Sequence, residues 1–234
     1  MRRNKILLIF FFVLSVFFQI SNFANRDKLY EFGFAVGLTE EVKSGLDLML
    51  IYLLVPLIFI VFMMSGSIHN LTYGYGKLQI IRHYSKTKLF LKCIGKGVFE
   101  TALITIFQAT VYIPFNSTML SLKCGIVQSL IMYFLVLNLI TTLQCILELY
   151  ITPHIANIVL FIYSYISCYI VQIFSVAPFL RILLFPSLLF GTLNSSVAFD
   201  NTYYLYIISV LLINILLVLI GIYKFKKTDI FWGE

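Results

Sequence analysis

The sequence predicts an all-α membrane protein, a single domain with six transmembrane helices and one re-entrant segment. Two observations predict this class. Of the 234 residues, 61% are apolar and 12% are charged, and the mean hydropathy is +0.98. A soluble domain is usually about 45–50% apolar and about 25% charged, so this chain has too few charges for a water-exposed surface. The apolar residues also gather in runs of about 18–22 residues, the length that crosses a bilayer as a helix.

Six of these runs are long enough to be spans. The first follows the basic residues MRRNK, and its 18 residues exceed the core of a cleaved signal peptide, which is about 7–15 residues long, so we interpret it as an uncleaved span. Tyrosines at both ends of the last run are typical of interfacial anchors. The expected spans are residues 6–23, 46–64, 98–115, 126–147, 155–174 and 204–223.

A seventh apolar stretch, residues 177–193, is interrupted by Pro178, Pro186 and Gly191 and contains Arg181. An arginine at the centre of a span costs about 2.5–3.5 kcal/mol on insertion scales. With six spans, 12 of the 17 Lys and Arg residues lie on one side, as expected for cytoplasmic loops, whereas a seventh span would move the basic C-terminal tail to the other side. We therefore expect this stretch to enter the outer leaflet and return, packed against its own bundle or a partner.

Recognisable catalytic motifs are absent from the sequence. It has no GxxxxGK[ST], HExxH or GxSxG pattern, so we expect no enzymatic activity and no nucleotide site in this chain. The four cysteines, at positions 93, 124, 145 and 168, form no CxxC pair, which predicts neither a disulfide framework nor a metal site. The excess of basic residues is therefore better explained by anionic lipid and membrane topology than by nucleic acid.

Two glutamates mark the inner ends of expected spans, Glu100 at the start of the third and Glu148 at the end of the fourth. They either mark the membrane boundary or form a gating ion pair, for example between Glu148 and a lysine of the basic loop 66–97. The spans contain no chain of acidic, histidine or arginine residues, which argues against a proton- or sodium-coupled transporter. Six polar residues within them are expected to join helices: Gln19, Gln108, Asn138, Gln144, Gln172 and Asn214.

The basic loop carries YGYGKLQIIRHYSKTKLFLK at residues 73–92, and the interrupted stretch carries LFPSLLFG at residues 184–191. With the six-span layout, these segments resemble the membrane subunit of a type-2 ABC exporter, of the small bacterial kind found in bacteriocin or peptide export and self-immunity. The resemblance covers nearly the whole chain in layout. It departs from the family in having no glutamate before the coupling helix and no amphipathic helix before the first span.

The resemblance implies a coupling helix near residues 78–84 that docks on the ATPase. The implied contact residues are Leu78, Ile80, Ile81, Arg82, Tyr84 and Lys86. It also implies two copies of an ATPase subunit that holds ATP and Mg, a second permease copy or a sister permease, and a peptide or amphipathic substrate. Both termini would be cytoplasmic, in a bacterial plasma membrane. Two other functions stay open: an ATP-independent immunity or sensor protein that binds a peptide, and a channel or secondary carrier. In either case the basic loop would be a lipid anchor.

Overall fold

The computed structural model describes residues 46–72, 85–115, 125–173, 177–189 and 201–227, with Ile6, 9–11, Val13 and Val16 of the first apolar run. The described residues form an all-α fold. Its elements are α2 (Leu46–Met64), α3 (Ser67–Thr72), α5 (Lys86–Phe115), α7 (Gly125–Leu147), α8 (Pro153–Ile173), α9 (Pro178–Leu183), the 3-10 helix η2 (Phe185–Leu189) and α11 (Asn201–Lys227).

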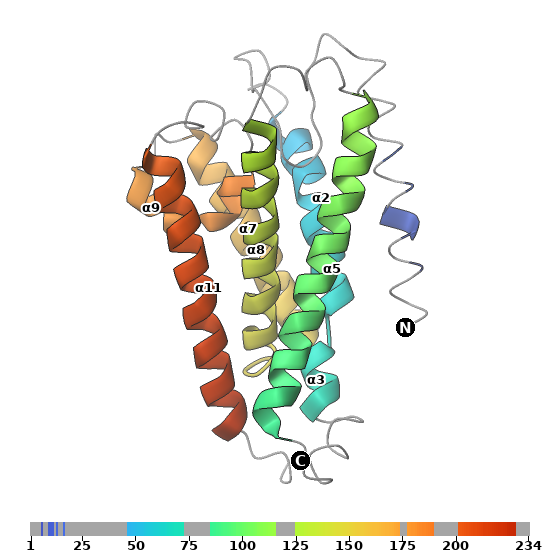
Figure 1. The fold of residues 1–234 in the computed structure, drawn as a ribbon, viewed down its shortest axis with the longest axis vertical. Helices are drawn as coiled ribbons and strands as arrows, with labels where there is room; N and C mark the ends of the chain where they lie inside the picture. The colour runs from blue at the N-terminus through green and yellow to red at the C-terminus, as the bar shows by residue number, and fades with distance from the viewer. Residues whose placement is uncertain are drawn as a thin grey trace.

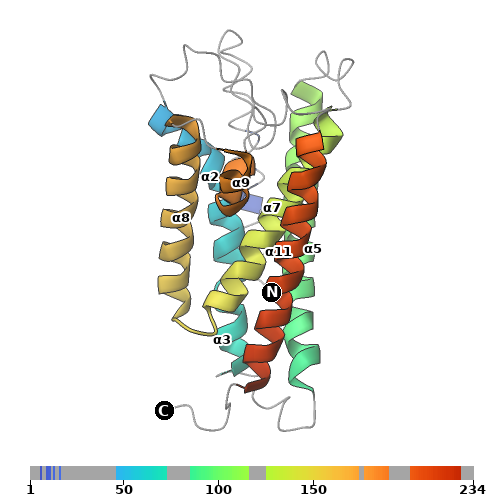
Figure 2. The ribbon, with the colours of Figure 1, turned by 90° about the vertical axis from the view of Figure 1, so that its left-hand side faces the viewer.

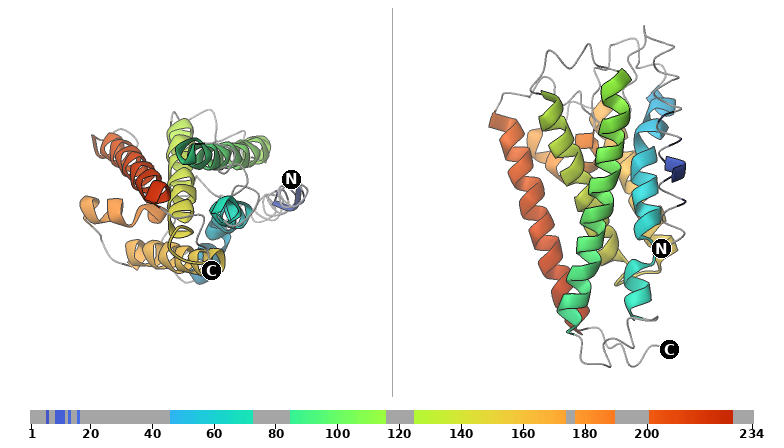
Figure 3. Two further views of the ribbon diagram at one scale, coloured as in Figure 1. Left: turned by 90° about the horizontal axis from the view of Figure 1, so that it is seen from below. Right: turned by 45° about the vertical axis from the view of Figure 1, so that its right-hand side comes forward.

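The long helices α2, α5, α7, α8 and α11 run side by side along the long axis of the molecule (Figures 1 and 2). Seen along that axis, α7 lies between the others (Figure 3), and it contacts α2, α5, α8 and α11 directly. Of the apolar window in α7, 61% is buried, compared with 22% of the window in α11. Helix α7 is therefore the core of the bundle, and α11 lies at its periphery.

Four helices are long and apolar enough to cross a membrane. Their apolar windows are Val55–Thr72, Leu130–Leu147, Pro153–Val171 and Tyr203–Lys227. The outward faces of α8 and α11 are apolar as well, with Ile158, Ile162, Ile208 and Leu212 among many exposed large side chains. An apolar surface of this extent is unsuited to water and suited to lipid. The chain is thus a multi-pass transmembrane helical protein.

The described helices agree with the expected spans to within four residues except at the third, and most of the first expected span, residues 6–23, lies outside the described residues. Helix α2 has the predicted bounds, and α7 and α8 begin within two residues of theirs. In contrast, α5 begins at Lys86, so the last residues of the loop predicted at 66–97 are helical, as is α3 near its start. Hydropathy placed the start of the predicted span at Val98 because four lysines precede it. Lysine is a good helix former, however, so the helix itself begins earlier.

The interrupted stretch folds into two short helices at one end of the bundle, beside the first turns of α11 (Figure 1). Pro178 occupies the first turn of α9, where proline fits because its missing N–H has no intrahelical role. Pro186 lies in η2, whose five residues are all buried and pack against α7 and α8. The expected packing on the bundle is therefore confirmed for residues 185–189, whereas Gly191 lies outside the described residues.

The first apolar run packs on α2 where it is described. Phe11 is fully buried, and its ring centroid lies 5.0 Å from that of Phe59. Ile6, Ile9 and Val13 are exposed. This run has the helical positions and the one-sided burial expected of a helix on the surface of the bundle.

Candidate functional site

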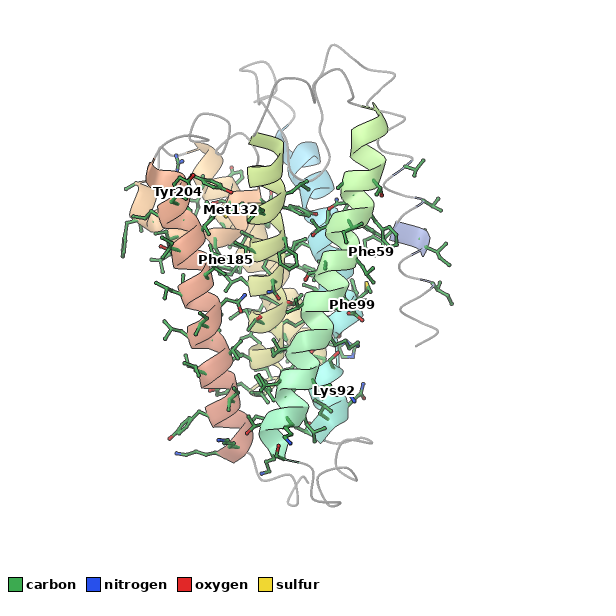
Figure 4. The ribbon with its side chains drawn as sticks, in the orientation of Figure 1. Phe59, Lys92, Phe99, Met132, Phe185 and Tyr204 are labelled. Carbon is green, nitrogen blue, oxygen red and sulfur yellow. The ribbon has the colours of Figure 1, made fainter. Side chains whose placement is uncertain are left out.

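One end of the bundle gathers all the lysines of the described residues, and we call it the lysine end. There α3, the start of α5, the turn from α7 to α8 and the end of α11 meet (Figure 2). Figure 4 shows Lys92 in this region, with Phe185 and Tyr204 toward the opposite end. All lysines of the described residues belong to these elements: Lys86, Lys88, Lys92, Lys96, Lys224, Lys226 and Lys227.

The start of α5 and the end of α11 are held together at the lysine end. The Lys86 ammonium donates to the Lys226 carbonyl at 3.2 Å, and the rings of Phe90 and Phe225 lie 5.6 Å apart. A Cβ added at Gly221 would lie 2.4 Å from Cζ of Phe90, so the absence of a side chain there allows the two helices to approach closely. Lysine ammonium groups are therefore presented on a packed surface rather than on separate helix ends.

A buried carboxylate lies beside this surface, at the joint between α2 and α3. Gly66 breaks the helical path with φ of +75°, a conformation that glycine adopts at little cost. The break leaves the first N–H groups of α3 without partners in their own helix. Glu148, which directly follows α7, accepts from the Gly66 N–H at 2.8 Å and from the Ile68 N–H at 3.1 Å. One side chain thus holds the start of α3 against the end of α7.

The same contact continues into a network of amide side chains. Gln144 Nε2 lies 2.8 Å from the Val61 carbonyl, 3.3 Å from Glu148 Oε1 and 3.1 Å from Asn157 Oδ1. Asn157 Nδ2 in turn donates to Ser65 Oγ at 3.1 Å. The network therefore connects α2, the α2–α3 joint, α7 and α8, and it satisfies polar groups that would otherwise be costly to bury.

The environment of Glu148 opposes its charge. Its exposed fraction is 7%, and burial raises the pKa of its carboxyl above the ordinary value, while hydrogen bonds from Gly66, Ile68 and Gln144 act in the opposite direction. Burial is the larger of these effects. Glu148 is therefore an ionisable group whose charge is opposed by burial and only partly offset by N–H donors of the α2–α3 joint and of Gln144.

Glu100 lies in a different setting, although the sequence gives both glutamates similar positions. Its Oε1 lies 3.6 Å from the Lys96 ammonium, one turn earlier on α5, and Lys96 is half exposed. The partners that the structure gives Glu148 are neutral N–H donors, whereas a lysine of the basic loop was one partner that the sequence left open. Of the two candidate gating residues, Glu100 thus forms an ion pair within one helix, and Glu148 joins separate helices.

The remaining predicted site residues are distributed over the molecule. Lys86 begins α5 and lies at the lysine end. Leu78, Ile80, Ile81, Arg82 and Tyr84 lie outside the described residues. Pro178, Arg181 and Pro186 belong to the opposite end, so the structure does not bring them together with Lys86, the one predicted coupling residue among those described.

Sequence reasoning missed Gly66, Ser65 and Asn157 as members of the network, and it expected Gln144 only as a residue that joins helices. The one available signal was Gly66, a glycine that follows an unbroken apolar run. Among the described residues, no group of three or more His, Cys, Asp or Glu side chains is placed to hold a metal ion. Cys93, Cys145 and Cys168 are free thiols and buried.

Comparisons with known proteins give a family and nothing beyond it. A family model described as "Protein of unknown function (DUF2705)" matches residues 6–231. No curated protein and no solved structure matches the chain significantly. Since the match includes every described helix, the chain belongs to the DUF2705 family.

Proposed function

We propose that this chain is the membrane-spanning permease subunit of an ATP-binding-cassette exporter, and that its lysine end receives a separate ATPase. The observation that carries the proposal is the surroundings of the segment 73–84. Thr72 and Ser85, the described residues on either side of it, both belong to the lysine end. Each is joined to a helix that is fixed to the bundle, α3 through Glu148 and α5 through Lys86.

The proposed topology has six spans, formed by the first apolar run, α5 and the four helices with membrane-crossing windows. The lysine end and both termini are cytoplasmic, in agreement with the positive-inside rule. Helix α5 has 30 residues and is about 45 Å long, whereas the hydrocarbon core of a bilayer is about 30 Å thick. Its first turns therefore extend toward the cytoplasm. In this orientation α9 and η2 form the re-entrant segment of the outer leaflet.

In the proposed mechanism, the segment 78–84 occupies a cleft of the ATPase. Leu78, Ile80 and Ile81 supply apolar contact, and Arg82 supplies a charge-assisted hydrogen bond to an acidic group. Lys86 and the other described lysines attract an acidic surface of the ATPase to the same end of the bundle. Closure of the ATPase dimer on ATP moves the segment, and a peptide or amphipathic substrate leaves between two permease subunits in the bacterial plasma membrane.

The test is purification of the tagged chain from its native host in mild detergent, followed by an ATPase assay. We expect a nucleotide-binding chain at equal stoichiometry and ATP turnover that vanadate inhibits. Arg82→Gln should lower the recovery of that chain several-fold. The matched control, Arg181→Gln, removes one positive charge at the opposite end and should leave recovery unchanged.

Purification of a stable membrane protein without an ATPase would contradict the proposal. It would favour a peptide-binding immunity protein if the chain binds a peptide, or a channel or carrier if reconstituted vesicles become permeable. A normal ATPase yield with Arg82→Gln would retain the permease function and remove Arg82 from the docking contact.

A further inference from the structure

At the joint between α2 and α3, a helix break is held by hydrogen bonds to a side chain from another part of the bundle. Helix α2 ends at Met64, Gly66 turns the chain, and α3 begins at Ser67. Glu148 accepts from the N–H groups of Gly66 and Ile68, on the α3 side of this break. A carboxylate that accepts two backbone N–H groups forms charge-assisted hydrogen bonds, which are shorter and stronger than neutral ones.

These hydrogen bonds connect two segments that are far apart in the sequence. Glu148 lies at the turn that connects α7 to α8, 80 residues away from Ile68. Through Gln144 it also contacts Asn157 on α8. Any displacement of α3 must therefore either move the α7–α8 turn or break these hydrogen bonds.

Helix α3 has few other polar attachments among the described residues. The Thr72 hydroxyl is directed to the carbonyls of Ile68 and His69 within the same helix, and Asn70 is exposed. The apolar attachments are Ile68, buried in one cluster with Met64, Phe90 and Cys145, and Leu71, which packs against that cluster. Apolar contacts are not directional and tolerate small movements, whereas the hydrogen bonds of Glu148 fix one position.

We propose that Glu148 is a positioning residue that transmits motion between α3 and the α7–α8 turn about the Gly66 joint. The role in transmission rests on the proposed function, because α3 directly precedes the segment that would contact the ATPase. The attachment of α3 by Glu148 is independent of that function. The two parts are therefore tested separately.

The test of the attachment is hydrogen–deuterium exchange of the full chain in lipid nanodiscs, read on peptides that cover residues 66–72. Glu148→Gln keeps the size of the side chain but offers one acceptor oxygen for two N–H donors. Exchange in this segment should be about tenfold faster or more, because a hydrogen bond to a charged group is lost. Glu100→Gln is the matched control, since Glu100 pairs with a lysine on its own helix, and exchange at residues 66–72 should be unchanged.

The test of transmission uses the complex with the ATPase, before and after trapping with vanadate. In the wild type, trapping should change exchange both at residues 66–72 and at residues 144–157. In Glu148→Gln the ATPase should still be bound and its KM for ATP retained, but trapping should no longer change exchange at residues 144–157. A purely structural role for Glu148 would loosen α3 and leave this nucleotide-dependent signal in place.

The outcomes separate the two parts. Wild-type protection of residues 66–72 in Glu148→Gln overturns the attachment, whatever the function of the chain. Faster exchange with an unchanged vanadate signal at residues 144–157 overturns transmission. Recovery of the wild-type chain without an ATPase overturns the proposed function, whereas the first test still decides the attachment.

Discussion

Each end of the bundle contains a break next to a short helix, but the two ends satisfy the freed backbone groups differently. At the opposite end, the chain turns at Leu184 between α9 and η2. The Leu184 N–H bonds the Leu180 carbonyl, and the Ser187 hydroxyl bonds the Leu184 carbonyl. The Tyr163 hydroxyl, on α8, donates to the Leu183 carbonyl. At this end, the backbone groups freed by the break are therefore satisfied by neutral groups, most of which are local.

At the lysine end, the break at Gly66 depends on Glu148, an ionisable residue 82 positions away. Hydrogen bonds from nearby neutral groups fix a turn and respond little to movement of other helices. A hydrogen bond to an ionisable residue that is distant in the sequence makes the conformation of one segment depend on another segment and on the protonation of that residue. This difference between the two ends is the reason why we propose coupled movement at the lysine end, where we also propose that an ATPase docks.

The largest expected effect comes from removing the carboxylate. Glu148→Ala leaves the Gly66 and Ile68 N–H groups without their acceptor in a buried position. Each unsatisfied buried donor costs about 1–3 kcal/mol, so the loss of the acceptor for both should lower the free energy of unfolding by about 2–6 kcal/mol. Thermal unfolding in detergent measures this fall, and Ser187→Ala, which removes a neutral hydroxyl at the other break, should cost about 1 kcal/mol. Equal losses for the two variants would contradict the contrast between the two ends.

Close approach of helices at the lysine end gives the next effect. Gly221→Ala places a methyl group against the Phe90 ring and should lower the free energy of unfolding by about 1–3 kcal/mol, the usual cost of overpacking. Phe90→Leu in the same chain should recover part of that loss. Gly95 on α5 is the control, because a Cβ there meets nothing within 4 Å. Gly95→Ala should stabilise the helix by about 0.5–1 kcal/mol.

Backbone conformation at the joint gives an effect of similar or smaller size. Gly66→Ala introduces no clash, since the nearest atom to the added Cβ is Asn70 Nδ2 at 3.8 Å. The cost comes from placing a side chain at positive φ, about 1–2 kcal/mol. If thermal unfolding of Gly66→Ala equals that of the wild type, the joint does not require a left-handed residue, and the described break is wrong.

The smallest effect is a pH dependence. Burial raises the pKa of Glu148 in the folded protein, so the folded state binds its proton more tightly than the unfolded state. The stability contributed by this proton is full below the ordinary glutamate pKa and is lost as the pH rises through the folded value. Compared with Glu148→Gln, the wild type should therefore lose stability as the pH is raised from 4 to 8, in unfolding experiments at matched ionic strength. If the stability of both proteins depended on pH with the same slope, Glu148 would be excluded as the source of that dependence.

The sequence predicts the bundle well because hydropathy decides it. The bounds of α2 follow from an apolar run that lipid would cover, and the packing of residues 185–189 follows from the need to cover an interrupted segment that cannot cross the membrane as one helix. The start of α5 was missed because hydropathy reports where a helix is in lipid, not where it begins. The site was predicted only in part. Glu148 was identified from its charge, but its partners are backbone N–H groups of a distant helix, and no residue type encodes such a contact.

The central claim is that the lysine end contacts an ATPase. Zero-length carbodiimide cross-linking in native membranes tests it directly, because this reagent joins lysine ammonium groups to carboxylates only where they touch. We expect Lys86, Lys88 or Lys92 to be joined to acidic residues of a chain that contains a GxxxxGK[ST] motif. Cross-links from these lysines only to the same chain or to other membrane proteins, in membranes that contain an intact ATPase, would contradict the claim.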